Sequence, residues 1–283
     1  MISNLTQLAV PRSTLGEGPC WDAAAGALYW TDIPASRVHC LADGHHRCWE
    51  IGRPAGAVVP RAGGGLVLAA RDGFLALDPA TGTLTMLAAV EPEITGNRMN
   101  DGACDRTGRF FAGTMADDEA PGAGALYRLD RDHRVTQVMA DVSISNGIDW
   151  SPDERLMYYI DSPTHRIDVF DYDPGTGTAA FSNGRTFARA GGGEVVPDGL
   201  TVDSEGGVWV ALWGGGQVRR YTPDGTLMLS VDLPAANVTS CAFGGPSLHT
   251  LYITTAAGPG SSGGALFACQ STVAGLPANP FRG

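Results

Sequence analysis

Four side chains with oxygen donors stand at matching points of a recurring sequence pattern. The two carboxylates and two amides belong to Glu17, Asn100, Asn146 and Asp198. Each lies five residues before another polar side chain, at Asp22, Asp105, Ser151 and Asp203. Hard divalent cations prefer carboxylate and carbonyl oxygens, and carboxylates that gather without a cation repel one another. If the recurring units surround an axis, the pattern therefore predicts an all-oxygen metal pocket.

Taken singly, these residues also suit ordinary turns. Asn146-Gly147 and Pro197-Asp198-Gly199 are turn signals, and Glu17-Gly18-Pro19 can be one. The shared spacing favours the pocket, because the first strand of every blade in a propeller lines the central channel. Equivalent positions on those strands would meet around one mouth.

The recurring unit is a strand, a tight turn and a second, apolar strand. It is clearest at residues 102–113, 148–160 and 200–212, and it continues into a third and a fourth strand. Equivalent positions step 46 residues from Asn100 to Asn146 and 52 from Asn146 to Asp198, which is the period of four-stranded propeller blades. The 83 residues between Glu17 and Asn100 fit two more blades.

Extending the pattern to both ends gives six units and no window with a helical period of apolar residues. We therefore predict an all-β fold, a six-bladed β-propeller with four-stranded antiparallel blades, as a single domain over residues 1–283. We expect a strand near residues 5–10 to pair with the final blade and fasten the ring.

The composition restricts the possible partners. The net charge of −11 opposes binding to nucleic acid and to anionic membranes. With no basic apolar leader and no long apolar run, we expect a cytoplasmic protein without a membrane partner. All 19 basic residues are arginine, which excludes a lysine Schiff base and a Walker-type phosphate loop.

The cysteines and histidines show no metal or catalytic spacing. The six cysteines form no CxxC pair, so we expect buried thiols in preference to disulfides or a zinc finger. The six histidines are scattered, which disfavours a Ser-His-Asp hydrolase. We expect His45-His46 to lie in a solvated loop, because neighbours on an extended chain point to opposite faces.

Six motifs along the chain resemble the senescence marker protein-30/gluconolactonase family, also called the regucalcin family. The motifs are residues 15–19, 97–102, 111–115, 145–147, 197–200 and 241–245, and the resemblance extends from about residue 14 to 272. In that family one divalent cation sits at the mouth of a six-bladed propeller. The resemblance implies Glu17, Asn146 and Asp198 as its protein ligands, with Asn100 and Arg98 as substrate-binding residues. Arg98 lies two residues before Asn100 and therefore on the same face of an extended strand.

The resemblance implies the hydrolysis of a sugar lactone to the aldonic acid. Asp198 would act as catalytic general base, with a hydroxide held by the metal as the alternative nucleophile. Asp118 matches a third substrate-binding position, where the family often has the longer glutamate. The Asp117 loop, residues 164–165 and residues 213–216 are candidate substrate-reading loops. The cation could be calcium, zinc, magnesium, manganese or ferrous iron.

Other functions remain open. One is a non-catalytic calcium-binding regulatory propeller, and another is an esterase acting on aryl or organophosphate esters. A third is a scaffold for protein partners, which would tolerate substitutions at Glu17 and Asp198. For the lactonase we expect a small sugar lactone as partner and a monomeric protein.

Overall fold

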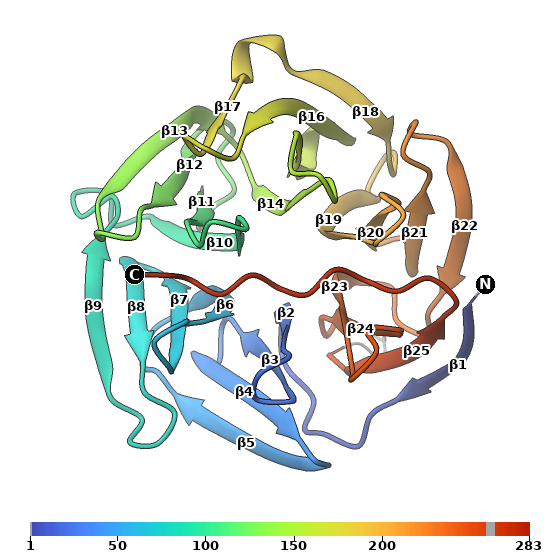
Figure 1. The fold of residues 1–283 in the computed structure, drawn as a ribbon, viewed down its shortest axis with the longest axis horizontal. Helices are drawn as coiled ribbons and strands as arrows, with labels where there is room; N and C mark the ends of the chain where they lie inside the picture. The colour runs from blue at the N-terminus through green and yellow to red at the C-terminus, as the bar shows by residue number, and fades with distance from the viewer. Residues whose placement is uncertain (1, 259–263) are drawn as a thin grey trace.

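The chain forms six small antiparallel sheets arranged around a central channel (Figure 1). The computed structural model describes residues 2–258 and 264–283, and within these ranges it contains 25 strands, two 3-10 turns and no α-helix. No helix of the described chain is long and apolar enough to cross a bilayer. The predicted six-bladed β-propeller is confirmed.

Within each blade, successive strands lie progressively further from the channel. The first three blades consist of β2 (Gly16–Asp22), β3 (Ala27–Asp32), β4 (Arg37–Ala42) and β5 (His45–Glu50); β6 (Ala55–Pro60), β7 (Leu66–Ala70), β8 (Gly73–Leu77) and β9 (Leu84–Ala89); and β10 (Asn97–Cys104), β11 (Phe110–Ala116), β12 (Gly124–Leu129) and β13 (Val135–Val142).

The other three blades include one irregular sheet and the blade that closes the ring. They consist of β14 (Ser145–Trp150), β15 (Leu156–Asp161), β16 (Arg166–Asp173), β17 (Thr178–Ala179) and β18 (Arg185–Arg189); β19 (Val196–Val202), β20 (Val208–Trp213), β21 (Gln217–Tyr221) and β22 (Leu227–Asp232); and β23 (Val238–Gly244), β24 (Thr250–Thr255), β25 (Phe267–Ser271) and β1 (Ile2–Gln7). In blade four, β17 and β18 both pair with β16. The turns are η1 (Ser162–Thr164) and η2 (Phe181–Asn183).

The N-terminal strand closes the ring. β1 pairs antiparallel with β25, with Ile2 opposite Ser271 and Gln7 opposite Phe267. The predicted pairing with the final blade is confirmed, and the strand covers residues 2–7, earlier than the predicted 5–10. Blade six therefore combines both ends of the propeller sequence.

The core lies between the blades, because each sheet packs a face against its neighbour. Six apolar clusters fill the six interfaces. At the interface of blades two and three, Phe74 meets Phe110 edge-on with ring centroids 5.3 Å apart. Because both faces of an inner sheet are covered, strands such as β7 are buried at every residue.

A C-terminal segment, residues 272–283, crosses the end of the channel from blade six to blade two (Figure 1). The Gly275 amide donates to the Leu248 carbonyl at 2.8 Å, and the Phe281 amide donates to the Pro60 carbonyl at 2.8 Å. The Phe281 side chain is completely buried in the cluster between blades two and three. The segment thus connects blade six to the interface of blades two and three.

Phe281→Ala is expected to lower the free energy of unfolding by about 3–5 kcal/mol, the usual loss for a fully buried phenylalanine. Urea denaturation of the variant and the wild type measures the difference. Phe187→Ala is the matched control, because Phe187 is only partly buried on the outer strand β18, and it should cost less. Equal losses for the two variants would contradict a role of the segment in holding the ring.

The prediction that His45-His46 lie in a loop was wrong, although His45 is solvent-exposed as expected. His45 and His46 begin β5, and His46 Nε2 lies 2.9 Å from Nδ1 of the buried His39. The His39 ring stacks on Trp30 with centroids 5.0 Å apart. Burial and the adjacent imidazole lower the His39 pKa to about 4, so His39 is neutral near pH 7. Burial also lowers the pKa of His46. The loop prediction failed because the Asp43-Gly44 turn, which has positive φ at both residues, forms a tight hairpin.

Candidate functional site

The inner strands begin at one mouth of the channel, and each is irregular near its start. In blade three, Met99 pairs with Thr114 and Gly102 with Ala112, so Asn100 and Asp101 share one partner position. The same register shift occurs at the start of the inner strand in the other five blades. Such bulges redirect side chains from the regular pleat.

Three of the four predicted oxygen donors share one ladder position. Asn100, Asn146 and Asp198 are each the first unpaired residue of their bulge. Glu17 differs, because it still pairs with Thr31 and the bulge holds Gly18, whose φ is +51°. Relative to the bulge of its own strand, Glu17 therefore lies one residue earlier than Asn100, Asn146 and Asp198 do, although the equal sequence spacing predicted the same position.

The inner strands approach each other closely at this level. A Cβ atom on Gly56 of blade two would lie 2.4–2.5 Å from backbone atoms of Asn100. A side chain at this position would push the neighbouring strand away. Blade two therefore contributes backbone alone at the level where blades one, three, four and five present oxygen donors.

Hydrogen bonds join Arg98, Asn100 and Asn146 into one chain. Arg98 Nη1 donates to Asn100 Oδ1 at 2.6 Å, and Asn100 Nδ2 donates to Asn146 Oδ1 at 2.9 Å and to the Ser145 carbonyl at 2.8 Å. Asn146 Nδ2 donates to Ser162 Oγ at 2.8 Å. The structure thus brings the predicted arginine and both amides together across two blades.

The carboxylates of Glu17 and Asp198 are buried and interact electrostatically. Burial, followed by the charge of Asp101, raises the Glu17 pKa to about 8. Burial, and then the charges of Glu17 and Asp101, raise the pKa of Asp198 well above its ordinary value. Arg98 opposes both shifts. The carboxylates of Glu17 and Asp198, from blades one and five, therefore interact with one guanidinium, that of Arg98.

Two residues of this region were not found from the sequence. Asp101 is buried beside Asn100, and burial raises its pKa to about 7. Its carboxylate accepts from the Gly102 amide at 2.7 Å. In the sequence it is indistinguishable from a turn aspartate. The residues around Ser162 in the sequence do not reveal its role, because its side chain contacts Asn146 and Pro197, which lie far away along the chain.

Asp118 lies exposed on the loop after β11, and its Oδ1 accepts from the Ala120 amide at 3.2 Å. The adjacent Asp117 forms a two-pronged ion pair with Arg71, at 2.8 and 2.9 Å. Arg71 also donates to the Asn97 carbonyl at 3.1 Å. The contacts described for Asp118 include none to Arg98, so its substrate-binding role stays a prediction.

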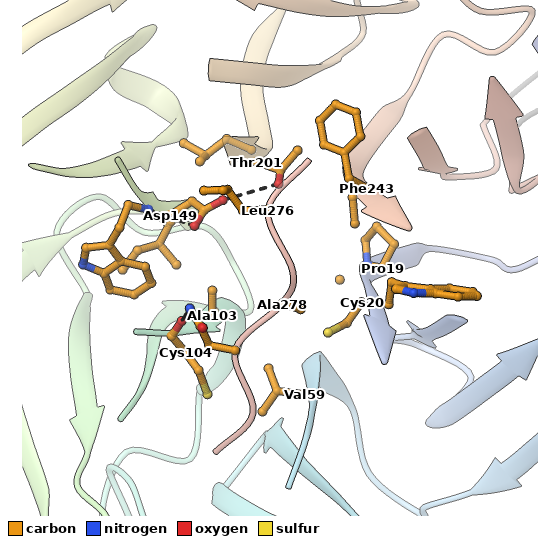
Figure 2. A pocket seen from close by; sticks show the side chains of 18 of the residues that line it. Pro19, Cys20, Val59, Ala103, Cys104, Asp149, Thr201, Phe243, Leu276 and Ala278 are labelled. Carbon is orange, nitrogen blue, oxygen red and sulfur yellow. Dashed lines mark hydrogen bonds between the residues drawn. The ribbon is translucent and has the colours of Figure 1, made fainter. Parts of the chain in front are cut away.

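A cavity of about 160 Å³ lies along the inner strands beyond the ring of oxygen donors (Figure 2). Leu276 and Ala278 of the C-terminal segment pass between Asp149 and Thr201 on one side and Cys20 on the other. Glu17, Asn100, Asn146 and Asp198 do not line this cavity, whose walls are the far halves of the inner strands. The cavity adjoins the candidate site, because Gly18 and Asp101, which lie next to Glu17 and Asn100, belong to its lining.

Three of the six cysteines lie around this cavity. Cys20, Cys104 and Cys241 line it, and all six thiols of the chain are free. Burial raises the pKa of Cys20 to about 12, so this thiol stays protonated near pH 7. Five cysteines are buried and Cys48 is exposed. The expectation of thiols in place of disulfides agrees with this arrangement.

The residues at the mouth fit an oxygen-liganded cation. In residues 2–258 and 264–283, no three His, Cys, Asp or Glu side chains form a metal-binding group. The candidate ligand set therefore includes an amide: it consists of the carboxylates of Glu17 and Asp198 and the side-chain oxygen of Asn146. The structure describes no hydrogen bond to the Asp198 carboxylate. Its lone pairs are thus available in a buried position beside Glu17, where a bound cation would favour the ionised form of both carboxyl groups.

The fold and the mouth define a class of proteins: six-bladed propellers with acidic and amide side chains at the start of the inner strands. Residues 15–257 match the family described as the SMP-30/Gluconolactonase/LRE-like region. The chain belongs to this family, which confirms the resemblance seen in the sequence.

Individual relatives agree with this assignment. Regucalcin of Bos taurus is 39% identical over 286 residues, which cover 95% of each chain. A crystal structure from Agrobacterium tumefaciens, titled a calcium-binding protein, regucalcin, has a TM-score of 0.93 and 30% identity and covers 99% of this chain and 98% of its own. A gluconolactonase from Xanthomonas campestris has a TM-score of 0.75 and 25% identity, and the match covers 94% of this chain and 89% of that protein.

Proposed function

We propose that the protein is a divalent-metal-dependent hydrolase that opens a sugar lactone to the aldonic acid. The main support is the convergence of Glu17, Asn146 and Asp198, from three blades, beside the hydrogen-bonded pair Arg98 and Asn100. The gluconolactonase among the structural neighbours supports the same reaction class. A small sugar lactone is the expected partner and the protein is expected to be a monomer, which light scattering tests.

Glu17, Asn146 and Asp198 would hold the cation. When bound, the cation supplies a Lewis acid for the lactone carbonyl and for the oxyanion that forms there. Arg98 donates hydrogen bonds to substrate oxygens, and Asn100 orients the guanidinium through its Oδ1 contact.

Asp198 takes one proton from the attacking water as general base. The hydroxide joins the carbonyl carbon, the bond to the ring oxygen breaks, and the proton goes to that oxygen. The net reaction adds one water across the ester bond.

Arg98→Ala is expected to raise KM and to lower kcat/KM about 10- to 100-fold, the effect of about 1.5–3 kcal/mol for a charge-assisted hydrogen bond. Acid release from an aldonolactone measures it, after subtraction of spontaneous ring opening. Arg185→Ala on the outer strand β18 is the matched control, since Arg185 pairs with the exposed Asp171 at 3.1 Å.

Two results would overturn the role of Arg98. An Arg98→Ala variant with wild-type kcat/KM would place the substrate elsewhere at the mouth. A variant that no longer binds metal would make Arg98 a support of the ligand loop in place of a substrate contact.

A non-catalytic calcium-binding protein is the second candidate, because the Agrobacterium tumefaciens structure is titled a calcium-binding protein. High-affinity calcium sites usually have six to eight oxygen ligands, and the mouth offers three from the protein. Calorimetry with calcium and a panel of aldonolactones and aryl or organophosphate esters, each run with several metals, separates the candidates. Submicromolar calcium binding without turnover favours the binding protein, and turnover of aryl esters alone favours an esterase.

A further inference from the structure

One hydroxyl group connects two of the candidate ligands. Ser162, the first residue of η1, is 2% exposed. Its Oγ accepts from Asn146 Nδ2 at 2.8 Å and donates to the Pro197 carbonyl at 2.6 Å. Pro197 directly precedes Asp198. Ser162 thus contacts the side chain of one candidate ligand and the backbone next to another.

The hydroxyl controls which way the Asn146 amide faces. A serine hydroxyl has one proton, and Ser162 uses it for the Pro197 carbonyl, so toward Asn146 its oxygen acts as an acceptor. The amide must then present its NH₂ group to Ser162 and its oxygen to the other side, where Asn100 Nδ2 donates to it. A flipped amide would lose both hydrogen bonds and would turn NH₂ toward the Asn100 donor.

The turn that contains Ser162 is hydrogen-bonded to the chain just before β14, the strand that carries Asn146. The Asp161 carboxylate accepts from the backbone amides of Ser143 at 3.1 Å and Ile144 at 2.9 Å, just before β14. In blade one, Asp32 holds the amides of residues 14 and 15 in the same way. The residue after Asp32 is the buried Ile33, so a hydroxyl at this point is not a general feature of the repeat. It occurs in the blade that presents an amide ligand.

We propose that Ser162 is a positioning residue for the metal centre, which holds Asn146 Oδ1 toward the cation and fixes the backbone before Asp198. This inference rests on the proposed metal site. Residues that orient metal ligands typically change metal affinity by 10- to 100-fold when substituted. Ser162 does not contact the substrate in this proposal.

The first test measures metal affinity directly. Metal-free wild type and Ser162→Ala are titrated with manganese and with calcium by calorimetry, and the variant is expected to bind about 10- to 100-fold more weakly. Ser162→Thr retains a hydroxyl and should remain within a few-fold of wild type. Ser151→Ala is the matched control, because Ser151 lies at the other end of blade four with its own hydroxyl contacts, to Asp153 at 2.7 Å and to the Leu156 amide at 3.0 Å.

A second variant isolates the effect on the amide. Asn146→Asp has two equivalent oxygens, so no flip can remove the ligand. Adding Ser162→Ala to Asn146→Asp is therefore expected to weaken binding much less than in the wild-type background. An equal loss in both backgrounds would overturn the orientation role.

The outcomes also separate this inference from the proposed function. If the wild type binds neither cation, the metal centre itself fails. If the wild type binds metal and Ser162→Ala binds it with the same affinity, the positioning role of Ser162 alone is wrong. A loss of affinity shared by Ser151→Ala would show a general loss of stability and would overturn the inference as well.

Discussion

Asp198→Asn is expected to fold and to lose about 10²- to 10⁴-fold in kcat/KM toward the preferred lactone, the contribution usual for a general base. The substitution also removes a charged ligand, while the amide keeps the shape of the side chain. Because burial raises the pKa of Asp198, the charged carboxylate is costly in the metal-free fold. We therefore expect the metal-free variant to unfold at a temperature no lower than that of the metal-free wild type.

The matched control is Asp149→Asn. Asp149 is another buried carboxylate of an inner strand, whose pKa burial raises to about 6, and it lines the cavity beyond the ring of oxygen donors. Its Oδ2 accepts from the Val202 amide and its Oδ1 from the Trp150 amide, both at 2.8 Å, so an asparagine oxygen retains one of these two bonds. Near-wild-type turnover in Asp198→Asn, or an equal loss in Asp149→Asn, would contradict the role assigned to Asp198.

The blades were predictable because their determinants are local. Turn residues such as Asp203 and Gly206 separate short apolar strands, and the period of these turns sets the number of blades. The positions of Asn100, Asn146 and Asp198 follow from the same repeat. Closure of the ring brings equivalent strands together, and no further information is needed to place those three side chains at one mouth.

The remaining features depend on contacts between distant strands. The offset of Glu17 results from a bulge that contains Gly18, and spacing alone does not reveal a bulge. Ser162 meets Asn146 from 16 residues away and Pro197 from 35. Asp101 is distinguished from an ordinary turn aspartate only by burial between blades. The C-terminal segment has no repeat to predict its path across the channel.

Removal of the metal is expected to abolish lactone hydrolysis, and one added divalent cation should restore it. Within the described chain, Arg98 is the only cationic group that interacts with both Glu17 and Asp198. A guanidinium is a weaker electrophile than a divalent cation, so Arg98 cannot replace the metal. Activity is measured after prolonged chelation and dialysis, with metal content checked by elemental analysis, and then in a series of added cations.

The same titration gives a readout that does not depend on turnover. A cation at about 100 times its Kd stabilises the native state by about 2.7 kcal/mol, so the melting temperature of the wild type should rise on addition of metal. Asp198→Asn should show little of this rise, because it lacks one charged ligand, whereas Asp149→Asn should show all of it. Metal-free protein that hydrolyses lactone at the full rate would mean that Glu17, Asn146 and Asp198 do not form a catalytic metal centre. Equal thermal shifts in the wild type and Asp198→Asn would place the cation at another site on the propeller.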